Sequence, residues 1–301
     1  VIYSQQIFPE TVAFAIVAFV LYHTLRPEQP TSPRLHALTV GGALAFLPHL
    51  HYKLTLTAAM LSLFFLWKNR HHWQTTLRWS LPPLLLSGIL FVAWIYTLFG
   101  TLSPQVFVAP IGGTFLAPVT LAAGLPGLFF DQEYGLFFYA PFYVLALPGA
   151  WWFCKDHRTR SDGIFLLLIY LVYHSIGAAY EMWYGSFSPV PRYLIPMLPI
   201  LILWSIRACA EYLQRSIWLR LLLLIALQST ITLLILANRM HMFGFELGSN
   251  SLLREVFHAK HVIPWLPTFT QGNLPAAYAQ TALLIVVLVL FLLPRSTPKA
   301  A

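Results

Sequence analysis

Long apolar runs separated by short polar segments dominate this chain. A helix that crosses a bilayer needs about 20 mostly apolar residues, and in hydrocarbon its backbone groups must be satisfied internally. The runs therefore predict an all-α fold, a polytopic transmembrane helical bundle with about nine spans. The second and third runs are short and lie around Pro48, His49 and His51, so they fit either a tilted helix pair or a re-entrant hairpin. The expected spans are 9–25, 35–50, 54–67, 81–99, 135–154, 163–180, 193–206, 217–238 and 276–293.

The composition supports a membrane protein. Of 301 residues, 58% are hydrophobic and 9% are charged, against about 25% charged residues in soluble domains. There is no Gly/Ser linker and no repeat of fixed period, which predicts a single transmembrane domain over residues 1–301. Cys154 and Cys209 fall at predicted cytoplasmic helix ends, where a disulfide is not expected.

The net charge of +8 is informative through its placement. Lys and Arg concentrate in every second loop, and by the positive-inside rule these loops are cytoplasmic. The charge therefore indicates orientation in a bilayer and not nucleic-acid binding. The predicted cytoplasmic side carries Arg26, Arg34, Lys68, Arg70, Arg78, Lys155, Arg158, Arg160, Arg207, Arg215, Arg220, Arg295 and Lys299.

Two cations on the opposite side are candidate ligand contacts. Lys53 ends the segment Leu47-Pro48-His49-Leu50-His51-Tyr52-Lys53, and Arg192 follows a turn rich in aromatic residues, Gly, Ser and Pro. A guanidinium and an ammonium at this depth can bind phosphate, although Lys and Tyr also serve as plain interfacial anchors. Glu10, behind Pro9, fits helix-terminus electrostatics or a role in the same site.

Asp131 and Glu133 are framed by Gly127 and Gly135 before a predicted span. Such a carboxylate pair can contact a hydroxyl acceptor, bind a divalent cation or supply a general base. The alternative is a polar helix start, with Asp131 as a cap and Glu133 near the positive helix end. His174, inside a predicted span, is expected to be a hydrogen-bonded core residue in preference to a proton relay.

Taken in order, three groups of segments resemble bacterial GT-C fold glycosyltransferases that use polyprenyl-phosphate sugars, related to protein mannosyltransferases and lipid A aminoarabinose transferases. They are the run from Tyr3 to Glu10, the run from Leu47 to Lys53, and the runs 127–141 and 183–199. The resemblance covers nearly the whole chain except 239–275. In that family the catalytic carboxylate, usually an Asp, lies in the first external loop, so we expect it upstream of Val1 in a longer chain.

The resemblance implies an enzyme of the bacterial inner membrane, multi-pass, that moves a sugar from a polyprenyl-phosphate donor to an acceptor on the non-cytoplasmic face. Its partners would be the bilayer and the lipid-linked sugar. A divalent cation, Mg²⁺ or Mn²⁺, is compatible with this reaction, although the sequence fixes no ligand set for one. The alternative is a transporter or flippase for a lipid-linked or anionic substrate, with the same cations binding the cargo. The resemblance implies donor phosphate contacts at Lys53 and Arg192, acceptor or metal contacts at Asp131 and Glu133, and substrate-lining positions at His51, Tyr139, Trp183, Tyr184 and Tyr193.

Overall fold

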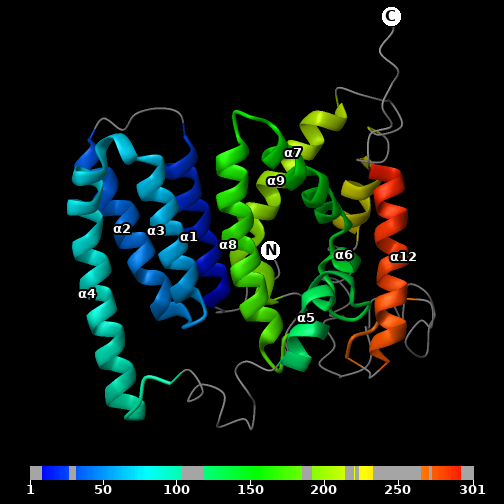
Figure 1. The fold of residues 1–301 in the computed structure, drawn as a ribbon, viewed down its shortest axis with the longest axis horizontal. Helices are drawn as coiled ribbons and strands as arrows, with labels where there is room; N and C mark the ends of the chain where they lie inside the picture. The colour runs from blue at the N-terminus through cyan, green and yellow to red at the C-terminus, as the bar shows by residue number, and fades with distance from the viewer. Residues whose placement is uncertain are drawn as a thin grey trace, which may run out of the picture. The chain divides into compact units, whose positions relative to one another are not determined.

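The fold was described from a computed structural model (Figure 1), which describes residues 9–26, 32–103, 118–184, 192–213, 220, 224–232, 266–270 and 273–292. Every regular element in these ranges is helical, which confirms the all-α prediction. Three described helical segments are long and apolar enough to cross a membrane, namely Arg70–Phe99, Arg160–Ala179 and Arg192–Leu213. The larger number of spans stays a prediction, and most of the span expected at 217–238 lies outside the described residues.

The chain divides into two compact units. The first comprises Val1–Ala122, Ser161–Trp183 and Arg192–Leu201, and the second comprises Ala123–Arg160, Tyr184–Pro191 and Ile202–Ala301. The single domain expected over residues 1–301 remains a prediction.

The first unit contains α1 (Pro9–Leu25), α2 (Pro33–Leu50), α3 (Leu54–Lys68) and α4 (Trp73–Phe99), which lie side by side in Figure 1. The first and third match the expected boundaries almost residue for residue. The helix α2 begins at Pro33, two residues before the expected start at Leu35, because Ser32 caps the Leu35 N–H and Pro33 fits the first turn. A short turn over residues 51–53 separates α2 from α3, so this pair is two packed helices.

The packing of α2 against α4 is close. A Cβ built on Gly41 would lie 2.7 Å from the Ser80 Cα, so only glycine lets the two backbones approach to this distance. One helical turn further on, the Ser87 hydroxyl donates to the Ala45 carbonyl oxygen, and Ser87 Oγ lies 2.8 Å from His49 Nε2. These contacts fix the C-terminal end of α2 beside α4.

The helix α8 (Arg160–Ala179) also belongs to the first unit from Ser161 onward, and it packs against α3 through Phe165, which stacks on Phe64 at 5.3 Å between ring centroids. At the N-terminal end of α8, Lys68 Nζ lies 3.1 Å from Asp162 Oδ2. Farther along α8, His174 is buried and its Nδ1 lies 3.2 Å from the Tyr170 hydroxyl. His174 is therefore the hydrogen-bonded core residue that the sequence predicted.

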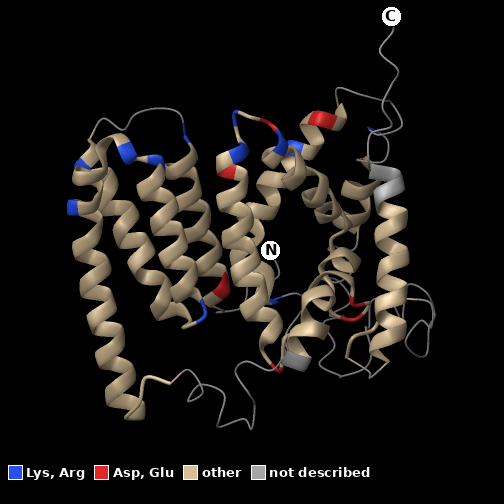
Figure 2. Ribbon diagram, viewed as in Figure 1, with Lys and Arg blue, Asp and Glu red and all other residues tan. Residues whose placement is uncertain are grey.

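The surface of the first unit is apolar along its length and charged at its ends. Leu86, Ile89 and Leu98 of α4 are largely exposed, as expected of side chains that face lipid. Figure 2 shows that lysines and arginines gather at one end of these helices, while a smaller acidic and basic group lies at the other. This distribution is compatible with a membrane protein, and the orientation derived from it stays a prediction.

The second unit departs from one sequence prediction. Residues 135–154 were expected to form one span, but they form α6 (Leu136–Tyr139), the 3-10 helix η5 (Pro141–Leu145) and α7 (Ala146–Lys155). Pro141 has no N–H to donate and disfavours the helical conformation of the residue before it. Ala140 accordingly adopts φ −140° and ψ 74° and ends α6.

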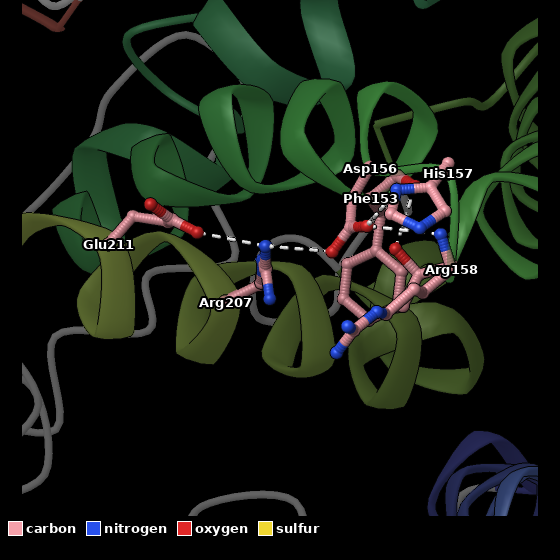
Figure 3. A network of polar contacts seen from close by, with 7 residues as sticks. Phe153, Asp156, His157, Arg158, Arg207 and Glu211 are labelled. Atoms are coloured by element: carbon pink, nitrogen blue, oxygen red, sulfur yellow. Dashed lines mark hydrogen bonds and ion pairs between the residues drawn. The ribbon is translucent and has the colours of Figure 1, made fainter.

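An ion-pair network ties the turn after α7 to α9 (Leu198–Leu213), whose residues from Ile202 belong to the second unit. Arg207 lies 3.2 Å from Asp156 Oδ2 and 2.8 Å from Glu211 Oε1 (Figure 3). The other Asp156 oxygen accepts the Arg158 N–H. Because the charges are mutually paired and hold a helix connection, they have a structural role.

Apolar packing and further helices complete the second unit. Trp152 of α7 packs edge-on against Tyr212 of α9, at 5.0 Å between ring centroids, and Cys209 packs on the same cluster. Cys154 and Cys209 are both free. This unit also includes α5 (Pro118–Phe130) from Ala123 onward, a helical stretch over residues 224–232, and α12 (Leu274–Leu292).

Candidate functional site

Three charged side chains from distant parts of the sequence meet in the first unit. Glu10 Oε1 lies 3.8 Å from Lys53 Nζ and 3.3 Å from Arg192 Nε. The side chains of Glu10 and Lys53 are only 3% and 6% exposed, and that of Arg192 is 23% exposed. Burial of charge is costly unless the charges are paired, so this cluster is the strongest candidate for a functional site in the described residues.

Local structure explains how each side chain reaches the cluster. Glu10 lies in the first turn of α1, Lys53 ends the short turn between α2 and α3, and Arg192 begins the 3-10 helix η6 (Arg192–Met197). Because α1 packs against η6, Glu10 and Arg192 are brought close together. Tyr193 supports both cations, since its ring centroid lies 3.8 Å from Lys53 Nζ and 5.2 Å from Arg192 Cζ.

A cavity of about 310 Å³ opens beside the cations. Lys53 and Arg192 both line it, whereas Glu10 does not. Its other walls are rich in aromatic side chains and come from the C-terminal parts of α2, α4 and α8, from the turns after α2 and α8, and from η6. The lining residues are Pro48, His49, Leu50, His51, Tyr52, Lys53, Phe91, Trp94, Ile176, Gly177, Tyr180, Arg192 and Tyr193.

Burial shifts the protonation of this site toward neutral forms. It lowers the pKa of Lys53 to about 7, while Glu10 raises this pKa and Arg192 lowers it further. Burial also lowers the pKa of His51 to about 3, with smaller contributions from Lys53 and Arg192, so its imidazole is neutral at pH 7. The pKa of Tyr52 is raised above its usual value by burial. Lys53 is therefore a cavity-lining cation whose charge changes near neutral pH.

Several predicted contact residues of the first unit meet at this cavity. The two predicted donor contacts, Lys53 and Arg192, share one carboxylate oxygen, and His51 and Tyr193 line the same cavity. Trp183 is buried in the first unit, at 3% exposure, and does not line the cavity. The predicted roles of these residues stay predictions, but the proximity of the two cations is a finding.

The predicted acidic pair lies in the second unit and has a different character. Asp131 is fully buried, and its Oδ1 accepts the N–H groups of Glu133 and Tyr134, both at 2.9 Å. Its Oδ2 accepts the Phe269 N–H at 2.6 Å. Gly135 closes the same turn, because its N–H donates to the Asp131 carbonyl oxygen at 2.6 Å. A Cβ at this position would lie 2.5 Å from that oxygen, so the turn requires glycine. Asp131 thus joins two segments that are far apart in the sequence.

Residues around Asp131 strengthen this junction. The Gln132 side chain donates to the Leu266 carbonyl at 2.9 Å, and its backbone N–H donates to the Pro267 carbonyl. The Thr270 hydroxyl donates to Glu133 Oε2 at 3.0 Å. We call the turn 131–135 together with residues 266–270 the acidic clamp.

Two of the predicted substrate-lining tyrosines belong to the surroundings of the acidic clamp. The Tyr139 hydroxyl donates to the Glu133 carbonyl at 2.9 Å. The Tyr184 ring packs against Tyr134, with centroids 5.3 Å apart. Tyr139 and Tyr184 are therefore close to Glu133, as the sequence grouped them, and their contact with substrate stays a prediction.

The arrangement of Asp131 fits a structural junction and does not fit a metal ligand. A divalent cation needs carboxylate lone pairs directed at it, and both Asp131 oxygens already accept backbone N–H groups. Within the described ranges, no group of three or more His, Cys, Asp or Glu side chains is arranged to hold a metal ion. Burial raises the pKa of Asp131 to about 7, an effect that the three N–H donors oppose and nearby Glu133 reinforces.

Sequence reasoning left out several residues that the fold brings to the cavity. Phe91 and Trp94 of α4 and Tyr180 after α8 form part of its walls. The spacing of Phe91 and Trp94 places them on one helix face, but membrane helices contain many aromatic residues, so this signal is weak. Glu10 carried a clearer signal, as an acidic residue beside the start of an otherwise uncharged run.

Comparison with known proteins adds no assignment. No protein-family model, curated protein or solved structure matches this chain.

Proposed function

We propose that this protein is an integral-membrane glycosyltransferase that takes a sugar from a polyprenyl-phosphate donor and transfers it to an acceptor on the non-cytoplasmic face of a bacterial inner membrane. One observation carries the proposal. Lys53 and Arg192, which the family resemblance implies as donor contacts, lie together at an aromatic cavity.

The chemistry of the cavity suits the phosphate end of such a donor. Arg192 can donate to phosphate oxygens with a planar guanidinium, and the Lys53 ammonium adds a point charge beside it. In the transfer, an acceptor oxygen attacks the anomeric carbon and loses its proton to a base, while the carbon–oxygen bond to phosphate breaks. The bond electrons remain on the departing polyprenyl phosphate. The two cations stabilise that developing negative charge.

The size and lining of the cavity agree with a small polar head on a lipid. About 310 Å³ lies at the lower end of the range for small-molecule sites, which is enough for a phosphate and one sugar ring. Trp94, Tyr180 and Tyr193 offer ring faces for the sugar and for the first isoprene units. In the family that this sequence resembles, the base is usually an Asp of the first external loop.

The alternative is a transporter or flippase in which Lys53 and Arg192 bind cargo. Such proteins place charged residues along a pathway through the membrane. In the described helices of the first unit, the Lys, Arg, Asp and Glu residues lie in the first or last turns or close to them. This placement supports chemistry near one face of the membrane.

The proposal is tested with the protein reconstituted in nanodiscs. We expect it to release polyprenyl phosphate from radiolabelled polyprenyl-phosphate sugars in the presence of acceptor, and to bind polyprenyl phosphate itself. Arg192→Ala should reduce both turnover and binding by at least about tenfold, since loss of a charged hydrogen bond costs about 1.5–3 kcal/mol. Arg34→Ala removes an exposed arginine at the opposite end of the same unit and should change neither.

Neither binding nor turnover across a panel of donors and acceptors would contradict the proposal. Movement of the intact lipid-linked sugar between leaflets of proteoliposomes, without release of polyprenyl phosphate, would support the transporter instead.

A further inference from the structure

The carboxylate of Glu10 lies outside the cavity while both of its cationic partners line it. One oxygen, Oε1, contacts both Lys53 and Arg192, and the other, Oε2, has no hydrogen-bond partner in the described residues. Glu10 is therefore placed to act on a ligand through the cations. A direct contact between Glu10 and an anion in the cavity is not what this geometry provides.

We propose that Glu10 is a positioning residue that holds Lys53 and Arg192 together at the cavity wall and keeps the Lys53 ammonium protonated for anion binding. The inference rests on the proposed function, in that the anion is the phosphate of a polyprenyl lipid. It adds to that function a residue with a defined task, which is to set the charge of the site.

Without a counter-ion, this environment would favour the neutral amine of Lys53 more strongly. Its side chain is 6% exposed, its Nζ has no hydrogen-bond partner in the described residues, and Arg192 is a nearby like charge. Burial and a like charge both favour the neutral amine, and an opposite charge within about 4–6 Å favours the ammonium. Glu10 Oε1 at 3.8 Å is that opposite charge.

Other groups around Lys53 do not replace Glu10. The titratable and charged groups that face it are Glu10 from α1, His51 and Tyr52 from its own turn, and Arg192 and Tyr193 from η6. His51 and Tyr52 are neutral near pH 7, because the pKa of His51 is lowered and that of Tyr52 is raised. Tyr193 offers only its ring face to the ammonium. Glu10 is thus the anion that faces Lys53 in the described part of the chain.

Binding of polyprenyl phosphate in nanodiscs, measured as a function of pH, tests the inference. In the wild type, binding should weaken as pH rises through about 7, the value to which the pKa of Lys53 is lowered. In Glu10→Gln, the pH midpoint should fall by between one and three units, as expected when an opposite charge is removed. In Glu10→Gln/Lys53→Arg, the guanidinium stays charged and binding at pH 8 should recover to within about threefold of the wild type.

The controls separate a charge effect from a structural one. Glu181→Gln removes the same charge from an exposed position in the same unit and should leave the midpoint unchanged. Glu10→Asp keeps the charge and should keep a midpoint near that of the wild type. If Glu10→Gln is poorly folded, Glu10→Asp, which keeps the carboxylate, still reports whether charge or packing matters.

The outcomes are distinguishable. If wild type binds polyprenyl phosphate and Glu10→Gln shows the same pH midpoint, the inference is wrong and the anion site stands. If the double variant does not recover binding, Glu10 acts through structure alone and the inference is also wrong. If wild type does not bind the lipid at any pH, the proposed function itself fails.

Discussion

At the scale of single residues, Lys53 makes the candidate site sensitive to pH. Its pKa is lowered to about 7 by burial, so the ammonium dominates below pH 7 and the neutral amine above it. Anion binding should therefore be strongest below pH 7 and should weaken by up to about tenfold per pH unit above it. Lys53→Arg should make binding nearly independent of pH from about 6 to 9, because a guanidinium does not titrate there. Wild-type binding that is unchanged over this range would show that Lys53 does not contact the anion.

Asp131 leads to a prediction about stability at the same scale. In Asp131→Asn, one side-chain oxygen can still accept the Glu133 and Tyr134 N–H groups, but an amide NH₂ would face the Phe269 N–H. A buried donor left without an acceptor costs about 1–3 kcal/mol, so the melting temperature in detergent should fall by several degrees. Asp162→Asn, which removes a partly exposed ion pair with Lys68, serves as the control. Such a pair contributes about 1 kcal/mol or less, so Asp162→Asn should lower the melting temperature less. Equal decreases in both variants would show that the Asp131 carboxylate does not stabilise the acidic clamp.

At the scale of helices, the close approach of α2 and α4 leads to a matched pair of variants. Gly41→Ala places a Cβ 2.7 Å from the Ser80 Cα and must separate the two helices, whereas a Cβ at the neighbouring Gly42 meets nothing within 4 Å. Gly41→Ala should lower the melting temperature, and it should also weaken anion binding, because α4 supplies Phe91 and Trp94 to the cavity wall. Gly42→Ala should be neutral or stabilising by up to about 1 kcal/mol, the helix propensity difference. Equal behaviour of the two variants would show that the α2–α4 contact is looser than described.

At the scale of the whole molecule, the charge distribution predicts orientation in the membrane. His72 and Ser103 are exposed residues on opposite sides of α4 in the sequence, and the positive-inside rule places the first in the cytoplasm. In a background of Cys154→Ser and Cys209→Ser, a membrane-impermeant maleimide should label Ser103→Cys in intact spheroplasts. It should label His72→Cys only after permeabilisation. Labelling of both positions from one side would show that α4 does not cross the membrane.

The sequence by itself determined the helical class, the boundaries of α1 and α3, and the separation of charges to the helix ends. These properties depend on the surrounding solvent and on local backbone preferences. A bilayer requires long apolar helices, and polar segments that contain Pro end such helices. The same rules predicted one span at residues 135–154, but the helix is interrupted at Pro141. Proline cannot donate a backbone hydrogen bond and disfavours a helical conformation of the preceding residue, whatever the apolar composition of the segment.

Only the tertiary structure decided which polar residues meet. Lys53 and Arg192 could each be recognised as cations on the unexpected side, but their sharing of Glu10 Oε1 depends on how α1 packs against η6. In the same way, Asp131 and Glu133 looked like a ligand pair in the sequence, and the backbone N–H of Phe269 makes Asp131 part of a junction. Local sequence determines which groups can carry charge, whereas their partners and burial are set by segments distant in the chain, and these decide whether a charge binds a ligand or holds the fold.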